Sequence, residues 1–111
     1  MNIEVTHLKR CDLIALEGRF DSNTAPALDQ VLNESMDAGV YRIVVDMADV
    51  EYFGSAAIRS LVQAYKECRR WNRGDVRLSN VNGRVRHVLE LAGIMPLIQT
   101  FDDNVAAVGS F

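Results

Sequence analysis

The chain has 111 residues, which suits one domain with a single hydrophobic core and is too short for two. Its residues are 49% hydrophobic and 24% charged, which is typical of a folded globular domain and excludes intrinsic disorder. The formal net charge of −3 argues against nucleic acid as a direct partner, because such a partner requires a basic face.

Two strands are predicted before the first helix. Residues 2–6 alternate Ile3 and Val5 with polar neighbours, the pattern of an edge strand with one covered face. Residues 12–18 carry apolar side chains on both faces, so we expect both faces of that strand to be covered. The polar residues between the two segments indicate a hairpin turn, which would pair the strands antiparallel.

The segment GRFDSNT, residues 18–24, predicts a turn ahead of a helix. Four consecutive side chains could cap that helix: Asp21, Ser22, Asn23 and Thr24. Pro26 suits the first helical turn, and Gly39 predicts the end of the helix. The residue types favour capping over a contact surface at this turn, but both interpretations stay open.

The central stretch, residues 41–65, predicts a buried strand that passes through a tight turn into an amphipathic helix. The run Ile43–Val45 is apolar without alternation, as in a strand covered on both faces, and Asp46, Asp49 and Gly54 indicate where the strand ends. Beyond the turn, apolar side chains recur with the helical period: Ile58, Leu61, Val62, Tyr65 and Cys68. Ser55 stands at the junction between strand and helix.

The remaining segments continue the alternation of strands and helices. Residues 76–81 predict a short strand, residues 85–92 a helix ended by Gly93, and residues 97–101 a last short strand. Asp102 or Asp103 is expected to cap a final turn of helix. This order favours an α/β fold with a sheet that contains parallel βαβ units.

Ser55 has three possible roles: helix cap, phosphorylation site or nucleophile. Capping is the commonest role of a serine at such a position. A phosphate at a helix N-terminus would be tolerated by the fold, because the helix dipole favours negative charge there. The sequence FGSAA lacks the GxSxG elbow, and His7 and His87 have no recognisable partner arrangement, so an enzyme is not indicated.

Other chemical signals are weak. Cys11 and Cys68 show no redox or zinc spacing, so we expect reduced thiols, and no metal or cofactor is indicated. A basic cluster fits a solvated helix end better than an anion or nucleic-acid site: Lys66, Arg69, Arg70, Arg73 and Arg77. Among the aromatic residues, Trp71, Tyr52 and Phe53 are interface candidates, although core burial is favoured for Tyr52 and Phe53.

No apolar run reaches the length of a membrane span, and residues 1–10 contain no hydrophobic signal core. We therefore expect a cytoplasmic, free-standing protein without a membrane partner.

Over essentially its whole length the chain resembles the STAS domain family, and within it the bacterial anti-sigma factor antagonists. Three stretches carry the resemblance: LEGRFDSNTAPAL, IVVDMADVEYFGSAAIRSL and LELAGIMPLIQTFDD. The resemblance implies one STAS domain over residues 1–111, with a mixed β-sheet and helices packed mainly on one face. It also implies a binding protein that is not an enzyme and needs no cofactor.

The resemblance further implies that Ser55 is phosphorylated by an anti-sigma factor serine kinase, which the unphosphorylated form binds, and that a phosphatase restores that form. The implied partner-binding residues lie in two turns and the following helix: Asp21, Ser22, Asn23, Gly54, Ala56 and Arg59. The family usually has Asp before the serine and Gly two residues after it, where this chain has Gly54 and Ala57. The alternative is a STAS module that binds a partner or small ligand without phosphorylation.

Overall fold

The computed structural model describes residues 1–111 and begins with the expected antiparallel hairpin. Strands β1 (Asn2–His7) and β2 (Asp12–Phe20) form it, and β1 is an edge strand. The sheet continues with β3 (Arg42–Phe53), β4 (Asp75–Ser79) and β5 (Thr100–Phe101) in the order β1-β2-β3-β4-β5. Each pair after the first is parallel, so the predicted mixed sheet with βαβ units is confirmed.

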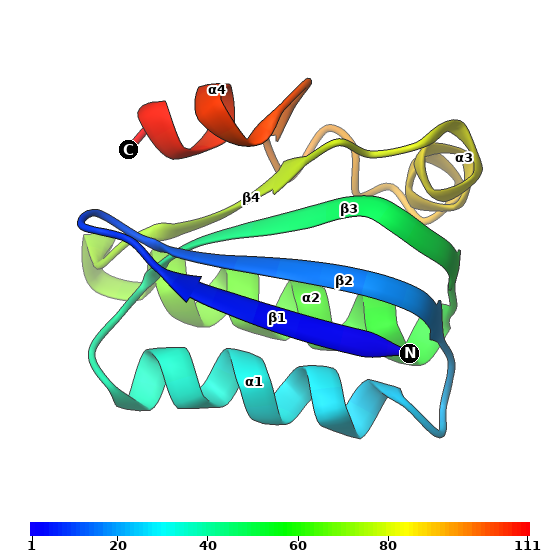
Figure 1. Cartoon of the computed structure of the whole chain (residues 1–111), viewed down its shortest axis with the longest axis horizontal. Helices are drawn as coiled ribbons and strands as arrows, with labels where there is room; N and C mark the ends of the chain where they lie inside the picture. Colours follow the sequence, from blue (N-terminus) through cyan, green and yellow to red (C-terminus); the bar gives the residue numbers. More distant parts are fainter.

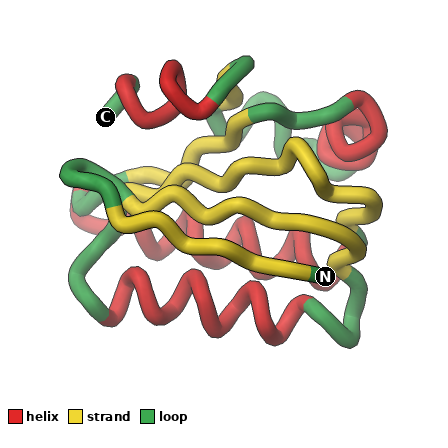
Figure 2. Tube along the Cα trace, in the orientation of Figure 1, coloured by secondary structure: helices red, strands yellow, loops and turns green.

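The helices are distributed unequally over the two faces of the sheet. Helices α1 (Ala25–Asp37) and α2 (Ser55–Arg69) lie side by side on one face, and a 3₁₀ turn, η1 (Arg70–Asn72), follows α2 (Figures 1 and 2). Helix α3 (Gly83–Leu91) lies beside the far end of β3, and the short α4 (Asn104–Gly109) covers part of the opposite face (Figure 1). No helix is both long and apolar enough to span a bilayer.

Two hydrophobic clusters hold these layers together. The larger has 21 buried residues from the sheet and from α1, α2 and α3, with Phe20 and Phe53 among its largest side chains. The smaller joins Cys11 and Val44 to Ala107 of α4. Ile43 and Val45 therefore face the larger core while Val44 faces the smaller one, which confirms that β3 is covered on both faces.

Three residues were expected to mark the end of β3, and the strand ends at the last of them: it passes Asp46 and Asp49 and stops at Phe53, just before Gly54. Two bulges in β3 each absorb an extra residue opposite β2, the first between Asp46 and Asp49 and the second between Val50 and Tyr52. The Asp46 carboxylate accepts a hydrogen bond from the Ala48 N–H at 3.0 Å within the first bulge. The strand therefore carries the Gly54 turn well past the point where β4 ends its pairing with β3.

Two aromatic residues near this extension have different fates. Phe53 is 1% exposed in the core, as expected, whereas Tyr52 is 42% exposed, so the prediction of burial for Tyr52 is wrong. Adjacent side chains of a strand point to opposite faces, and only the Phe53 side is covered here by α1 and α2.

Trp71, the third aromatic interface candidate, is 77% exposed and adopts a left-handed backbone with φ of 59° in the η1 turn.

Candidate functional site

The turn after β2 and the turn after β3 lie next to each other at one edge of the sheet. Phe20 and Phe53, the last residues of the two strands, are register partners. The Gly54 N–H donates to the Phe20 carbonyl oxygen at 2.9 Å, which joins the two turns directly. The chain enters α1 and α2 from this edge (Figure 1). Parallel strands present their carboxyl ends together, and binding sites of α/β proteins commonly form there.

The first turn is organised by the side chain of Asp21. Its Oδ1 accepts hydrogen bonds from the backbone N–H groups of Asn23, at 2.9 Å, and Thr24, at 3.2 Å. These bonds, the Asn23 bond foremost, hold the pKa of the Asp21 carboxyl below its ordinary value. The carboxylate is therefore ionised at neutral pH, and the turn keeps a negative charge at the sheet edge.

Thr24 has a different role from the one that capping predicts. It occupies the N-cap position of α1 without a side-chain cap bond. Its hydroxyl instead accepts from the Asp21 N–H at 2.9 Å and donates to the Arg19 carbonyl at 2.9 Å. Ser22 and Asn23 are exposed at the tip of the turn. Hydrogen bonds of Asp21 and Thr24 thus hold the turn in its conformation, and the exposed side chains of Ser22 and Asn23 are free to contact a partner protein.

The second turn places Ser55 at the start of α2. Gly54 is the N-cap residue, in extended conformation with φ −85° and ψ 179°, and Ser55 is the first helical residue. Interpreting Ser55 as the helix cap is therefore wrong: the N-cap position belongs to Gly54, one residue earlier, and no side chain caps this helix. The Ser55 side chain is exposed, and no hydrogen bond ties its hydroxyl to the rest of the protein.

The backbone ahead of Ser55 leaves the helix end open to an anion. The first hydrogen bond of α2 runs from the Ile58 N–H to the Gly54 carbonyl at 3.0 Å. The N–H groups of Ser55 and Ala56 precede that bond and have no acceptor within the helix. Free N–H groups and the helix dipole together favour negative charge at this point.

Tyr52 and Arg19 are part of this surface. The sequence offered Tyr52 as one of three aromatic interface candidates, with burial favoured, and gave Arg19 no role. The Tyr52 ring lies against Gly54: a Cβ atom at Gly54 would lie 2.9 Å from Tyr52 Cε2 and 3.0 Å from its hydroxyl. The Arg19 guanidinium carbon lies 4.6 Å from the centre of the same ring. Arg19 and Tyr52 are register partners of β2 and β3, a relation that appears only once the strands are paired.

The remaining predicted partner-binding residues lie along the first turns of α2. Ala56 is half-buried and Arg59 is exposed. Arg59 is four residues after Ser55, so both side chains share one face of the helix. Gly54 is buried, and Tyr52 covers it. The structure thus gathers Asp21, Ser22, Asn23 and Ser55 at one edge, while Gly54 contributes backbone rather than exposed surface.

The basic cluster lies at the opposite end of α2 from Ser55. Arg70 and Arg73 pair with Glu67, at 3.9 Å and 2.8 Å. Arg73 also donates to the Glu67 carbonyl near the helix end, at 2.6 Å. These contacts match the interpretation of a solvated helix end with favourable cations. Arg69 and Arg77 pair with Asp75 instead and belong to a separate cavity.

Comparison with known proteins identifies the family. The family model described as the STAS domain matches residues 2–107. The chain belongs to the STAS domain family. A Bordetella bronchiseptica relative, provisionally named the anti-sigma factor antagonist BtrV, is 27% identical over 99 residues, which cover 89% of this chain and 84% of the relative.

Solved STAS structures show the same fold. The crystal structure of an anti-sigma factor antagonist from Mycobacterium paratuberculosis superposes with a TM-score of 0.87 at 19% identity, and the match covers 98% of this chain and 92% of that one. The Bacillus cell fate determinant SpoIIAA in its phosphorylated form superposes with a TM-score of 0.76 at 15% identity, over 99% of this chain and 100% of that one. The expected STAS fold is therefore confirmed.

Proposed function

We propose that this STAS domain is an anti-sigma factor antagonist whose binding to an anti-sigma factor serine kinase is switched by phosphorylation of Ser55. The observation that carries the proposal is the position of Ser55: an exposed hydroxyl with no internal hydrogen bond, at the N-terminus of α2 and beside the Asp21 turn. The naming of relatives as anti-sigma factor antagonists supports the choice of partner.

The fold can accept a phosphate on Ser55 without rearrangement. Phosphorylation adds about −1.5 to −2 charges, and a helix N-terminus favours such charge by about 0.3 to 1 kcal/mol. Arg59, on the same face of α2, supplies a nearby cation. The modification therefore acts on the surface and leaves the core, which Phe53 and Leu61 form beneath it, unchanged.

The same charge would exclude a partner that contacts this edge. A phosphate on Ser55 would add its negative charge beside the ionised Asp21, and the two together would oppose an acidic or apolar partner surface. A loss of about 2.8 kcal/mol in binding is a hundredfold loss of affinity. We expect the docking surface to comprise exposed and half-buried side chains of the two turns and of α2, around the backbone of Gly54: Asp21, Ser22, Asn23, Ala56 and Arg59.

Kinase assay and mass spectrometry test the acceptor. Incubated with its cognate kinase and ATP, the protein should gain a single phosphate on Ser55, and Ser55→Ala should gain none. Ser22 is an exposed serine in the adjacent turn and therefore the natural competing site. Phosphate mapped to Ser22, or no modification, would reject Ser55 as the acceptor.

Binding measurements test the switch. Ser55→Asp should weaken kinase binding by about tenfold or more, since 1.4 kcal/mol is tenfold in affinity. Gln99→Glu adds the same charge at an exposed position outside the two turns and should leave binding unchanged. Equal binding by wild type and Ser55→Asp would favour the alternative, a STAS module that binds a partner or ligand without phosphorylation.

We further propose that a phosphatase reverses the phosphorylation of Ser55 and that both reactions take place in the cytoplasm.

A further inference from the structure

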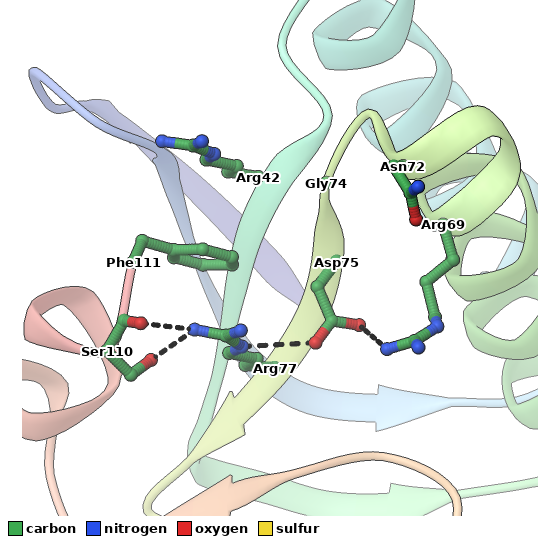
Figure 3. Close-up of a pocket in the computed structure, with 8 residues that line it drawn as sticks. All are labelled: Arg42, Arg69, Asn72, Gly74, Asp75, Arg77, Ser110 and Phe111. Atoms are coloured by element: carbon green, nitrogen blue, oxygen red, sulfur yellow. Dashed lines mark hydrogen bonds and ion pairs between the residues drawn. The ribbon is translucent and has the colours of Figure 1, made fainter.

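A cavity of about 350 Å³ opens at the end of the sheet opposite Ser55. Its walls come from segments far apart in the chain: the start of β3, the end of α2, the start of β4 and the residues after α4 (Figure 3). Only one of its lining residues, Phe111, is hydrophobic. The composition of the walls therefore suits a polar ligand, and the volume falls within the usual range for small-molecule sites.

A buried carboxylate fixes two arginines in this cavity. The Asp75 side chain is 7% exposed and pairs with Arg77 Nε at 3.1 Å and with Arg69 Nη1 at 3.5 Å. Arg77 also donates from Nη1 to the Ser110 carbonyl and hydroxyl oxygens, both at 2.7 Å. Its guanidinium carbon lies 4.1 Å from the centre of the Phe111 ring. The Arg77 side chain is thus held in one position by contacts on several sides.

The cavity keeps an excess of positive charge after this pairing. The side chain of Arg42, at the start of β3, is exposed and makes no ion pair or hydrogen bond (Figure 3). Three guanidinium groups and one carboxylate line the cavity, a formal balance of +2. A free α-carboxylate on Phe111 would reduce that balance to +1 and leave it positive. The chain as a whole has a net charge of −3, so this excess is local.

We infer that the cavity between Arg42, Arg69 and Arg77 binds the phosphoryl group of a small polar molecule. Guanidinium groups bind phosphate oxygens with charge-assisted hydrogen bonds, and Asp75 already orients two of the three, with Arg77 Nη2 still free of protein partners. Arg42 supplies the charge that Asp75 does not neutralise. The site is independent of the proposed phosphorylation of Ser55, because the two lie at opposite ends of α2.

Titration calorimetry in phosphate-free buffer tests this site with two probes, inorganic phosphate and glycerol 3-phosphate. We expect saturable binding of one probe molecule per chain, and no binding of glycerol. Tighter binding of glycerol 3-phosphate would identify a phosphorylated metabolite as the ligand, whereas tighter binding of inorganic phosphate would identify the free ion. Absence of saturable binding by both would overturn the inference.

Two single-charge variants separate the cavity from general electrostatic attraction. Arg42→Gln should weaken phosphate binding by about tenfold, the effect of losing one charge-assisted hydrogen bond. Lys66→Gln removes the same charge from an exposed position near the same end of α2 but outside the cavity. It should change affinity by less than about twofold at physiological salt, where exposed charges are screened. Equal losses in the two variants would contradict a defined site.

The location of bound phosphate is read from amide chemical shifts. Binding in the cavity should move the signals of Asn72, Gly74 and Ser110. The open N-terminus of α2 is the competing anion site in this fold. Shifts concentrated at Gly54 and Ser55 would therefore place phosphate at the wrong end of the helix and reject the cavity.

Discussion

At the level of single residues, the contact between Tyr52 and Gly54 explains a departure from the family pattern. The resemblance leads us to expect Asp before the phosphoacceptor serine, where this chain has glycine. The space that the first side-chain atom of such an Asp would need is taken by the Tyr52 ring, 2.9 Å away. Glycine at this position allows the close approach of the Tyr52 ring and is not needed for backbone freedom, because φ is −85°.

The Gly54→Asp variant tests this account. Since Tyr52 is 42% exposed, its ring can swing outward, and we expect a loss in unfolding free energy below about 1 kcal/mol. The displaced ring should leave Arg19, which would appear as a change in the NMR signals of Tyr52 and Arg19. Gly83→Asp is the control, because a Cβ at Gly83 meets no atom within 4 Å. Unchanged Tyr52 signals in Gly54→Asp would contradict the proposed crowding.

At the level of elements, a polar network fastens the first bulge of β3 to the end of β4 and to α4. Asp46 accepts from Asn80 Nδ2 at 3.1 Å and from Asn104 Nδ2 at 3.0 Å. Asn104 Oδ1 in turn accepts from the Ser79 hydroxyl at 2.6 Å. Helix α4 has only six residues and few buried side chains, so these bonds are a large part of what positions it.

Asp46→Ala should therefore loosen α4 selectively. We expect a loss of about 1 to 3 kcal/mol in unfolding free energy, because two amide side chains lose their common acceptor. Hydrogen exchange should accelerate in α4 and β5 more than in α1. Asp49→Ala is the matched control: Asp49 is exposed on the same strand, and its removal should stay within about 0.5 kcal/mol. Uniform acceleration across α1 and α4 would count against a local role.

At the level of the whole molecule, the buried thiol of Cys68 links stability to pH. Cys11 and Cys68 are both free and buried, as expected for reduced thiols. Burial raises the pKa of the Cys68 thiol from 9.0 to about 12. The unfolded chain loses this proton at lower pH than the folded protein does. The protonated thiol therefore contributes stability below pH 9 that is lost as the pH rises toward 12.

Thermal unfolding between pH 8 and pH 11 measures this contribution, where the upper value lies about one unit below the folded pKa of about 12. We expect the melting temperature of the wild type to fall more steeply with pH than that of Cys68→Ala, whatever the stability of the variant at pH 8. Cys68 should also resist alkylation in the native state and react fully in denaturant. Parallel pH profiles of the two proteins would show that Cys68 does not carry the effect.

The sequence alone determined the order of strands and helices, the mixed sheet and the family. The alternation typical of a strand and the period typical of a helix involve only residues close together in the chain. Segments such as 2–6 and 55–68 therefore indicate their secondary structure without knowledge of the rest of the fold. The turn residues around Asp21 and Ser55 were identifiable for the same reason. The sequence did not show which of Asp46, Asp49 and Gly54 ends β3, because two bulges defined by pairing with β2 carry the strand past the first two.

Only the tertiary structure decided what surrounds those turns. It placed Gly54 rather than Ser55 at the helix cap, brought Tyr52 and Arg19 over that glycine, and left Ser55 exposed. It likewise placed Arg69 and Arg77 against one buried carboxylate, in a cavity that Arg42 also lines. These arrangements depend on the register between strands and on how a helix end meets a distant strand. No local pattern of residues encodes such relations, because each partner is supplied by another part of the chain.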